Sequence, residues 1–212
     1  MWLEYLIVAV ALVVAYLLGS IPTGYLVGKW SGIDIREHGS GSTGATNVWR
    51  VLGKTKGIAV FVVDFSKGIG AIALWQWLAQ FTPYFQPWQD WLTVGIAFLA
   101  IVGHSLPVWI NWRGGKSVAT GLGILFWLNW QTALVALGIW LGIMAVTRTV
   151  SLSSIVGAVS APICLVLFHA PLAYQLLAGI ASIYILWTHR SNIQRLRKGE
   201  EYSFHPKPES PN

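Results

Sequence analysis

Glycines, hydroxyl residues and arginines gather between residues 29 and 56, the longest polar interval of the chain. Gly39, Gly41 and Gly44 can adopt positive φ, so their consecutive N–H groups could surround anionic oxygens. Arg50 could bind a phosphate through two parallel hydrogen bonds. The interval therefore predicts a phosphate site. The alternative is a flexible, solvated loop.

A second polar cluster contains Gly114, Gly115 and Lys116, followed by Ser117 and an apolar segment. It resembles the end of a Walker A loop, but Ile110 stands where that motif requires a glycine, so a nucleotide triphosphatase is not expected. Glycine N–H groups, a lysine and a helix N-terminus still predict an anion site. The alternative is a glycine turn with a lysine that reaches to the membrane surface.

Two further clusters carry hydroxyl, imidazole and amide groups. Ser151, Ser153 and Ser154 open an apolar segment, where they either cap a helix or supply hydroxyls to a site. His189 and Asn192 are three residues apart and share a face of a continuing helix. We interpret this pair as a hydroxyl-binding group, with an interface histidine as the alternative.

Several familiar catalytic patterns are absent from the sequence. It has no Gly-x-Ser-x-Gly, no His-Glu-x-x-His and no set of Cys and His residues with metal-ligand spacing. We therefore expect neither a metal nor another cofactor, and no Ser-His-Asp hydrolase. Cations, hydroxyls, an amide and a histidine suit phosphate-bearing substrates and an electrophile that arrives already activated.

The elements that must position these groups are membrane helices. Of 212 residues, 55% are hydrophobic and only 10% are charged, and the mean hydropathy is +0.59. Such a composition predicts an all-α integral membrane protein. The 14 Lys and Arg residues exceed the 8 Asp and Glu residues, but they are spread over several loops, so no nucleic acid partner is expected. Seven apolar segments, some of them short, cover about 3–27, 57–80, 91–112, 117–129, 131–147, 152–168 and 171–188.

Basic residues follow the first, third, fifth and seventh segments, whereas the connections at 81–90, 129–131 and 169–171 have none. By the positive-inside rule the N-terminus is outside and the C-terminus cytoplasmic, with all four polar clusters on the cytoplasmic side. Asp64 and Lys67 are expected to form a structural pair. Residues 1–201 form one domain, and 202–212 a disordered tail. Tryptophans near segment ends predict interface anchors at 75, 77, 88, 91, 109, 112, 127, 130 and 187.

The motifs resemble those of the bacterial membrane-integral acyl-phosphate:glycerol-3-phosphate acyltransferases, the PlsY family. The likeness runs from about residue 17 to 201 and rests on five or six blocks in the same order. They are Gly-Ser-Ile-Pro-Thr-Gly, Gly-Ser-Gly-Ser-Thr-Gly-Ala-Thr-Asn-Val-x-Arg, Asp-Phe-Ser-Lys-Gly, Gly-His-x-x-Pro with Gly-Gly-Lys, Ser-Leu-Ser-Ser-Ile, and His-x-x-Asn-Ile-x-Arg-Leu-x-x-Gly-x-Glu. The family has a seven-helix membrane fold.

The resemblance implies transfer of an acyl group from acyl phosphate to the 1-hydroxyl of glycerol 3-phosphate, giving lysophosphatidic acid and inorganic phosphate without an acyl-enzyme. It implies a multi-pass protein of the bacterial inner membrane, in contact with membrane lipid, whose active site faces the cytoplasm. Ser40, Arg50 and Lys116 would hold phosphate, and Ser154, His189 and Asn192 would bind or orient the glycerol end and the phosphate. Of these residues, the resemblance implies that His189 and Ser40 are catalytic. The supporting positions are Gly39, Gly41, Thr46, Asn47, Gly114 and Gly115. Ser42 replaces the family's usual Asn, and Arg113 and Ser117 replace Lys and Gly around the Gly-Gly-Lys segment.

Two points stay open from the sequence. His189 could accept the hydroxyl proton as a general base, or it could orient glycerol 3-phosphate while a substrate phosphate takes the proton; we favour the second, because no carboxylate is evidently placed to orient the imidazole. Other functions remain, namely a transporter or channel for a phosphorylated solute, or an acyltransferase that uses acyl-CoA or acyl carrier protein.

Overall fold

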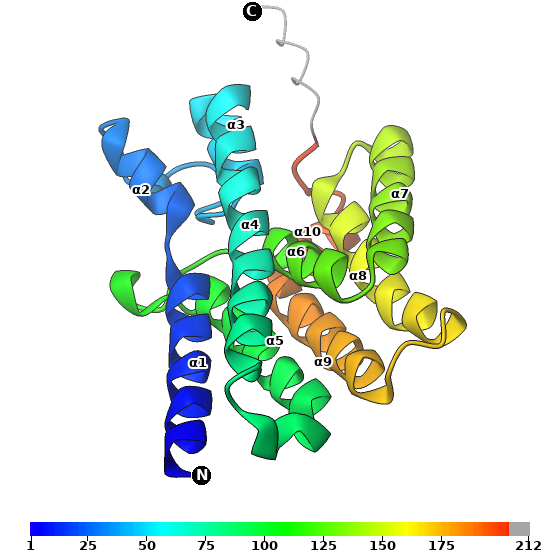
Figure 1. Cartoon of the computed structure of the whole chain (residues 1–212). Coiled ribbons are helices and arrows are strands. Elements are labelled where there is room, and N and C mark those ends of the chain that lie inside the picture. Colours follow the sequence, from blue (N-terminus) through cyan, green and yellow to red (C-terminus); the bar gives the residue numbers. More distant parts are fainter. Residues whose placement is uncertain (204–212) are drawn as a thin grey trace, which may run out of the picture.

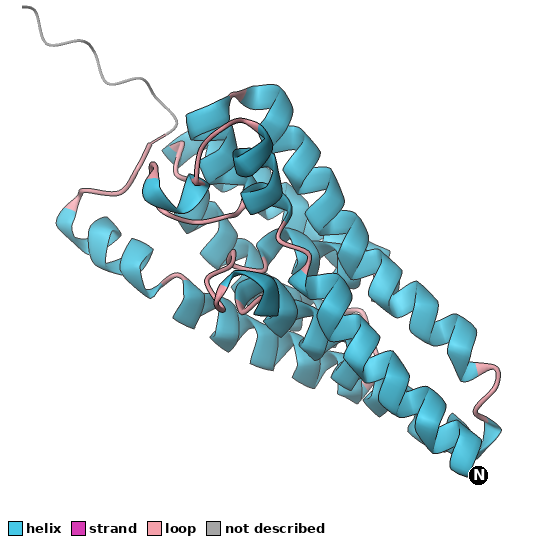
Figure 2. Cartoon of the chain, turned by 90° about the vertical axis from the view of Figure 1, so that its left-hand side faces the viewer, coloured by secondary structure: helices cyan, strands magenta, loops and turns pink. Residues whose placement is uncertain are grey.

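The computed structural model describes residues 1–203, which contain helices and no strand (Figures 1 and 2). The all-α fold class is confirmed for this part of the chain, and residues 204–212 of the predicted tail lie outside it. The helices are α1 (Trp2–Ser20), α2 (Thr23–Trp30), α3 (Ala45–Leu52), α4 (Lys54–Ala79), α5 (Gln89–Ser105), α6 (Val118–Leu128), α7 (Trp130–Thr147), α8 (Val150–Leu167), α9 (Leu172–Thr188) and α10 (Arg190–Lys198). Short 3-10 helices occur at Ile35–Glu37, Pro83–Trp88 and Val108–Ile110.

Five helical stretches are long and apolar enough to cross a membrane, and α9 with α10, bent by 59°, makes a sixth candidate. The five are Trp2–Trp30, Lys54–Ala79, Pro83–Ile110, Trp130–Thr147 and Val150–Leu167. All seven predicted apolar segments are helical, but α6 has only 11 residues. At about 1.5 Å per residue it covers roughly half of a hydrocarbon core of ~30 Å. By length and composition, the described residues therefore contain five or six candidate spans, and α6 is an additional, shorter apolar helix.

The first span is broken where Pro22 follows Ile21, between α1 and α2. Lys67 of α4 donates to the carbonyl oxygen of Ile21 at 3.0 Å, and its ammonium lies 2.9 Å from a carboxylate oxygen of Asp64. Both side chains are buried, so each charge is neutralised within the helix bundle. The predicted structural pair is thus present, and its lysine also bonds a carbonyl at the break between α1 and α2, which accepts from the Thr23 N–H as well.

Small residues allow α1 and α5 to pack closely. A Cβ added to Gly19 would lie 2.2 Å from the Ala100 carbonyl oxygen, and one added to Gly103 would lie 2.3 Å from that of Tyr16. Glycine at such crossings is a common device of membrane helices. Trp75 packs in the same core with 1% of its surface exposed and donates to Thr93. The expectation that it anchors the membrane interface was wrong, because its indole N–H has a partner inside the bundle.

A second close crossing joins α4 to the short helix α6. A Cβ on Gly68 would lie 2.3 Å from the Thr120 carbonyl oxygen, and one on Gly123 would lie 2.1 Å from that of Phe65. This contact fixes α6 against α4 and thereby sets the position of the Gly-Gly-Lys segment that precedes it.

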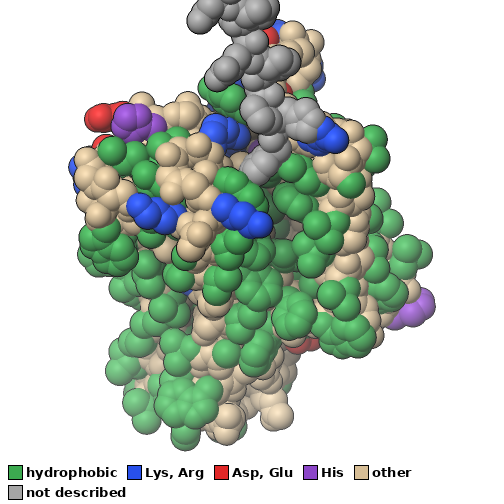
Figure 3. Space-filling view, turned by 90° about the horizontal axis from the view of Figure 1, so that it is seen from above, with side chains coloured by type: hydrophobic (Ala, Val, Ile, Leu, Met, Phe, Trp, Pro, Cys, Tyr) green, Lys and Arg blue, Asp and Glu red, His purple; other side chains and the backbone are tan. Residues whose placement is uncertain are grey.

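The N-terminus lies at the end of the bundle opposite α2 and α3 (Figure 1). Lys and Arg side chains gather on the face that is seen from above in Figure 3, at the α2 and α3 end. The polar interval that contains Arg50 therefore lies at the basic end of the bundle.

Candidate functional site

Asn47 organises the first polar loop. Its Oδ1 accepts from the Ser40 N–H at 2.9 Å and from Arg50 at 3.3 Å, and its Nδ2 donates to the carbonyls of Ile35, His38 and Ser42 at 3.3, 3.0 and 2.9 Å. With 1% of its surface exposed, Asn47 of α3 is the centre around which the loop folds.

The glycines of this loop serve that packing. Gly39 has φ +59°, and a Cβ there would lie 2.3 Å from Asn47 Oδ1. The N–H groups of Ser40, Gly41 and Gly44 are bonded within the loop, to Asn47, His38 and Ser42. The prediction that glycine N–H groups surround an anion is therefore wrong for Gly41 and Gly44, whose N–H groups already have partners, and Gly44 has φ −73° instead of a positive value. Side chains such as those of Ser40 and Arg50 remain for a ligand.

The Gly-Gly-Lys segment folds onto the C-terminal end of α5. The N–H groups of Gly114 and Gly115 donate to the carbonyls of Ser105 and His104 at 3.0 and 3.1 Å. A Cβ on Gly115 would lie 2.1 Å from His104 Nε2, so only glycine fits there. Here too the glycine N–H groups are used inside the protein. The group of this turn that faces the cavity is the Lys116 side chain.

Lys116 contacts the end of α9 and the start of α10. Its Nζ donates to Asn192 Oδ1 at 2.5 Å, and its carbonyl accepts from Thr188 at 3.4 Å. Burial, opposed by the carboxylate of Glu201, lowers the pKa of Lys116 to about 8. The lysine is thus a cation at neutral pH with an incompletely compensated charge, which suits a site for an anion.

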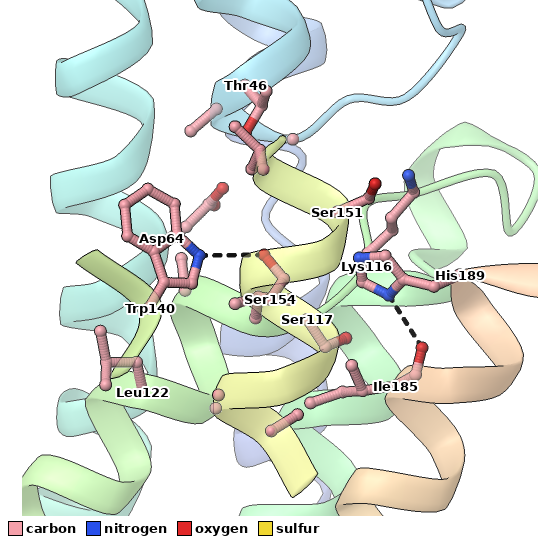
Figure 4. A pocket seen from close by; sticks show the side chains of 18 of the residues that line it. Thr46, Asp64, Lys116, Ser117, Leu122, Trp140, Ser151, Ser154, Ile185 and His189 are labelled. Atoms are coloured by element: carbon pink, nitrogen blue, oxygen red, sulfur yellow. Dashed lines mark hydrogen bonds between the residues drawn. The ribbon is translucent and has the colours of Figure 1, made fainter. Parts of the chain in front are cut away.

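His189 lies just beyond the end of α9 and is buried. Its Nδ1 lies 2.8 Å from the Ile185 carbonyl oxygen, which can only accept, so we assign the proton to Nδ1 (Figure 4). The imidazole is therefore oriented by a backbone carbonyl, and Nε2 is the nitrogen left for a ligand. Burial and the nearby Lys116 lower the pKa of His189 to about 4, which favours the neutral ring.

Glu201 joins two helices of the site, α8 and α10. Its Oε1 accepts from Asn192 at 2.6 Å and from Ser151 of α8 at 3.0 Å, and its Oε2 accepts from Arg195 at 2.9 Å. Next to it, the ring of Tyr202 lies 4.8 Å from the Arg50 guanidinium and 5.2 Å from that of Arg195. These contacts hold the segment after α10 against the site.

The serines at the start of α8 do not cap the helix, because no side chain accepts from its first N–H groups. Ser153 donates to the Thr149 carbonyl at 3.0 Å, whereas Ser154 accepts from the indole N–H of Trp140 at 3.1 Å (Figure 4). The capping interpretation is therefore wrong for these serines, and Ser151 and Ser154 line the cavity described next.

One cavity of about 640 Å³ brings the candidate residues together. Its polar part is lined by Ser40, Arg50, Lys116, Ser154, His189 and Asn192, and Thr46 and Asn47 also reach it. The rest of its wall is mostly apolar and comes mainly from α4, α6, α7, α8 and α9, but it also includes Asp64, His104, Ser117, Ser151, Ser182 and Glu201. Gly39, Gly41, Gly114 and Gly115 are not among the lining residues and act by shaping the loops.

Sequence reasoning missed Trp140, Glu201 and Tyr202 as parts of the site. Trp140 lies inside an apolar run with no polar neighbour to mark it. Glu201 is a carboxylate beside a basic helix, which was a usable signal. Within residues 1–203 no group of three or more His, Cys, Asp or Glu residues could hold a metal ion.

The chain is similar to known proteins over most of its length. The family model for glycerol-3-phosphate acyltransferase matches residues 9–199. A glycerol-3-phosphate acyltransferase of Thermosynechococcus vestitus is 50% identical over 191 residues, covering 89% of this chain and 90% of that protein. One of Synechococcus elongatus is 48% identical over 196 residues, covering 92% and 93%.

Two solved structures have the same fold. They are crystal structures of PlsY, an integral membrane glycerol 3-phosphate acyltransferase, in its glycerol 3-phosphate form and its lysophosphatidic acid form. Their TM-scores are 0.85 and 0.82, each at 36% identity. Both alignments cover 93% of this chain, and 96% and 95% of the two solved chains.

Proposed function

Given that the chain belongs to the glycerol-3-phosphate acyltransferase family and is a PlsY-like integral membrane acyltransferase of glycerol 3-phosphate, we propose that its donor is an acyl phosphate. The hydroxyl oxygen of glycerol 3-phosphate attacks the acyl carbonyl carbon. The bond between that carbon and the phosphate oxygen breaks, and its electron pair leaves with phosphate. The products are lysophosphatidic acid and inorganic phosphate, and no side chain is acylated.

The observation that carries the proposal is the division of one cavity into a cationic end and an apolar remainder. Arg50, Lys116 and His189 are far apart in the sequence but line the same space. An acyl phosphate has a matching shape, a phosphate joined through a carbonyl to a long apolar chain. Its anhydride is already activated, so the protein needs only to place the hydroxyl and stabilise negative charge.

The cations suit the phosphate groups of the two substrates. Arg50 can bind one with its planar guanidinium, and Lys116, held by Asn192, supplies a second charge. Ser40 lies at the same end of the cavity and can donate to phosphate.

His189 suits the role of orienting glycerol 3-phosphate. A ring that has a pKa of about 4 is a weak base at neutral pH, whereas its Nε2 can accept a hydrogen bond from a hydroxyl. The proton of the attacking hydroxyl then passes to a phosphate of the substrates.

The test of the proposal is a donor comparison with purified protein in detergent. We expect lysophosphatidic acid and phosphate from palmitoyl phosphate with glycerol 3-phosphate, and no product from palmitoyl-CoA or palmitoyl carrier protein. Product without a sealed vesicle excludes a pure transporter of a phosphorylated solute. A higher rate with either thioester donor would overturn the choice of acyl phosphate, and a covalently acylated side chain trapped during turnover would overturn the direct attack.

We also propose that the protein lies in the bacterial inner membrane with the site toward the cytoplasm. The basic residues at the α2 and α3 end support this orientation. In a Cys164→Ser background, a cysteine replacing the exposed Lys54 should resist a membrane-impermeant maleimide in intact cells and react after lysis. Labelling in intact cells would reverse the orientation.

A further inference from the structure

Trp140 of α7 lines the cavity directly opposite a serine of α8. Its indole Nε1 donates to Ser154 Oγ at 3.1 Å (Figure 4). An indole N–H can only donate, so the serine oxygen is the acceptor in this pair. The hydroxyl proton of Ser154 is therefore directed elsewhere.

The other serines at this end of α8 use their protons inside the protein. Ser151 donates to Glu201 and Ser153 to the Thr149 carbonyl. Ser154 is buried, yet within residues 1–203 no oxygen or nitrogen accepts its proton. Buried polar hydrogens normally have a partner, so a cavity-lining hydroxyl with an unused proton indicates a ligand acceptor.

Ser154 lies where the polar part of the cavity meets its apolar part. Ser151, about one helical turn earlier, faces the polar residues of the site. The cavity-lining positions further along α8 are Gly157, Ala158, Ala161 and Leu165, all apolar. In an acyl phosphate the carbonyl joins the phosphate to the chain, so a donor bound along this cavity has its carbonyl beside Ser154.

We propose that Trp140 is a positioning residue that holds Ser154 so that the serine hydroxyl donates to the carbonyl oxygen of the acyl donor. The inference rests on the proposed function and adds to it the group that meets the charge on that oxygen. As the glycerol oxygen attacks, negative charge grows there, and a fixed donor stabilises it. Ser154 keeps its proton throughout; the glycerol proton ends on phosphate.

The indole contributes in two ways. By occupying the serine oxygen it opposes the rotamer in which a helical serine bonds back to the carbonyl four residues earlier, as Ser153 does. A hydroxyl that accepts one hydrogen bond is also a stronger donor of the next. Both effects are lost when the N–H is removed, even if an aromatic ring remains.

The experiment is a double-mutant cycle of Trp140→Phe and Ser154→Ala, with initial rates measured at saturating palmitoyl phosphate and glycerol 3-phosphate. We expect kcat to fall about tenfold in Trp140→Phe and on the order of 10²-fold in Ser154→Ala, with little change in either KM. In the Ser154→Ala background, Trp140→Phe should change kcat by less than about twofold, because its effect passes through the serine. Ser154→Thr, which keeps a hydroxyl, should recover part of the lost rate.

Trp75→Phe is the matched control, because its indole also donates to a hydroxyl, that of Thr93, but lies in the helix core away from the cavity. Trp140→Met is a second variant, used if Trp140→Phe does not accumulate, since methionine fills space without an N–H. Equal losses of kcat in Trp140→Phe and Trp75→Phe would overturn the inference. A tenfold fall in kcat when Trp140→Phe is added to Ser154→Ala would also overturn the inference. If the unchanged protein makes no lysophosphatidic acid from acyl phosphate, the proposed function fails and this inference fails with it.

Discussion

The charge of Lys116 predicts how the reaction depends on pH. The ammonium binds phosphate only when protonated, and its pKa is lowered to about 8, mainly by burial. The protonated fraction is therefore about 0.9 at pH 7, about 0.5 at pH 8 and about 0.1 at pH 9. Because the charged form is the low-pH form, activity is lost as pH rises through 8.

The measurement is kcat/KM for glycerol 3-phosphate between pH 6 and 10, since this ratio reports the pKa of the free enzyme. It should fall about sixteenfold from pH 8 to pH 9.5, with a limiting slope of one proton. The profile of kcat should bend at a higher pH, because bound phosphate favours the ammonium. Hydrolysis of the donor without protein is subtracted at each pH.

Lys116→Arg and Lys116→Met separate charge from shape. Arginine stays charged over this range, so the alkaline limb near pH 8 should disappear even if the rate is lower. Methionine fills a similar volume without charge and should leave a low rate with no limb. A limb that persists in Lys116→Arg would assign the titration to another group, and a flat profile up to pH 10 in the unchanged protein would refute the reasoning.

Four other variants test the site. Asn47→Ala should lower the free energy of unfolding by about 3 kcal/mol, since its loop partners lose their bonds, and an unchanged thermal unfolding curve in detergent would contradict this. Gly115→Ala should raise KM for glycerol 3-phosphate, because the added methyl group would clash with the His104 ring. Gly70→Ala is the control, because Gly70 has open space around it, and equal KM values in the two variants would argue against the clash. Tyr202→Leu should raise KM about fivefold for the substrate that Arg50 binds, and Tyr202→Phe should not, because only the ring is needed. His189→Ala should strongly raise KM for glycerol 3-phosphate; a normal KM with kcat reduced by orders of magnitude would instead make the imidazole a base.

Hydropathy and charge placement predicted the helical segments well, because each depends on its own residues. The length of α6 as a helix and the burial of Trp75 depend on partners far away in the sequence. A tryptophan near a segment end has the same local sequence whether it faces lipid or Thr93. The sequence could therefore not distinguish an interface anchor from a core residue there.

The site was predicted as a set of residue types rather than as a geometry. Ser40, Arg50, Lys116, Ser154, His189 and Asn192 do line one cavity. The glycines, however, were assigned to anion binding because a glycine-rich sequence looks the same when its N–H groups bond internally. Which partner those groups choose is decided by Asn47 and by the end of α5, and neither contact is visible from spacing.

Glu201 gives the site a charge balance that residue types alone would not suggest. Arg50, Lys116 and Arg195 bring three cations close together, and a single carboxylate compensates one of them directly, at Arg195. The same carboxylate fixes Asn192, whose other end holds the Lys116 ammonium. Two positive charges thus remain for ligands that carry negative charge, and they are held before any ligand binds. This arrangement suits a reaction that consumes two phosphate-bearing substrates and releases one phosphate. Because the positive charges are already fixed in place, little reorganisation is needed when negative charge builds up on the leaving phosphate.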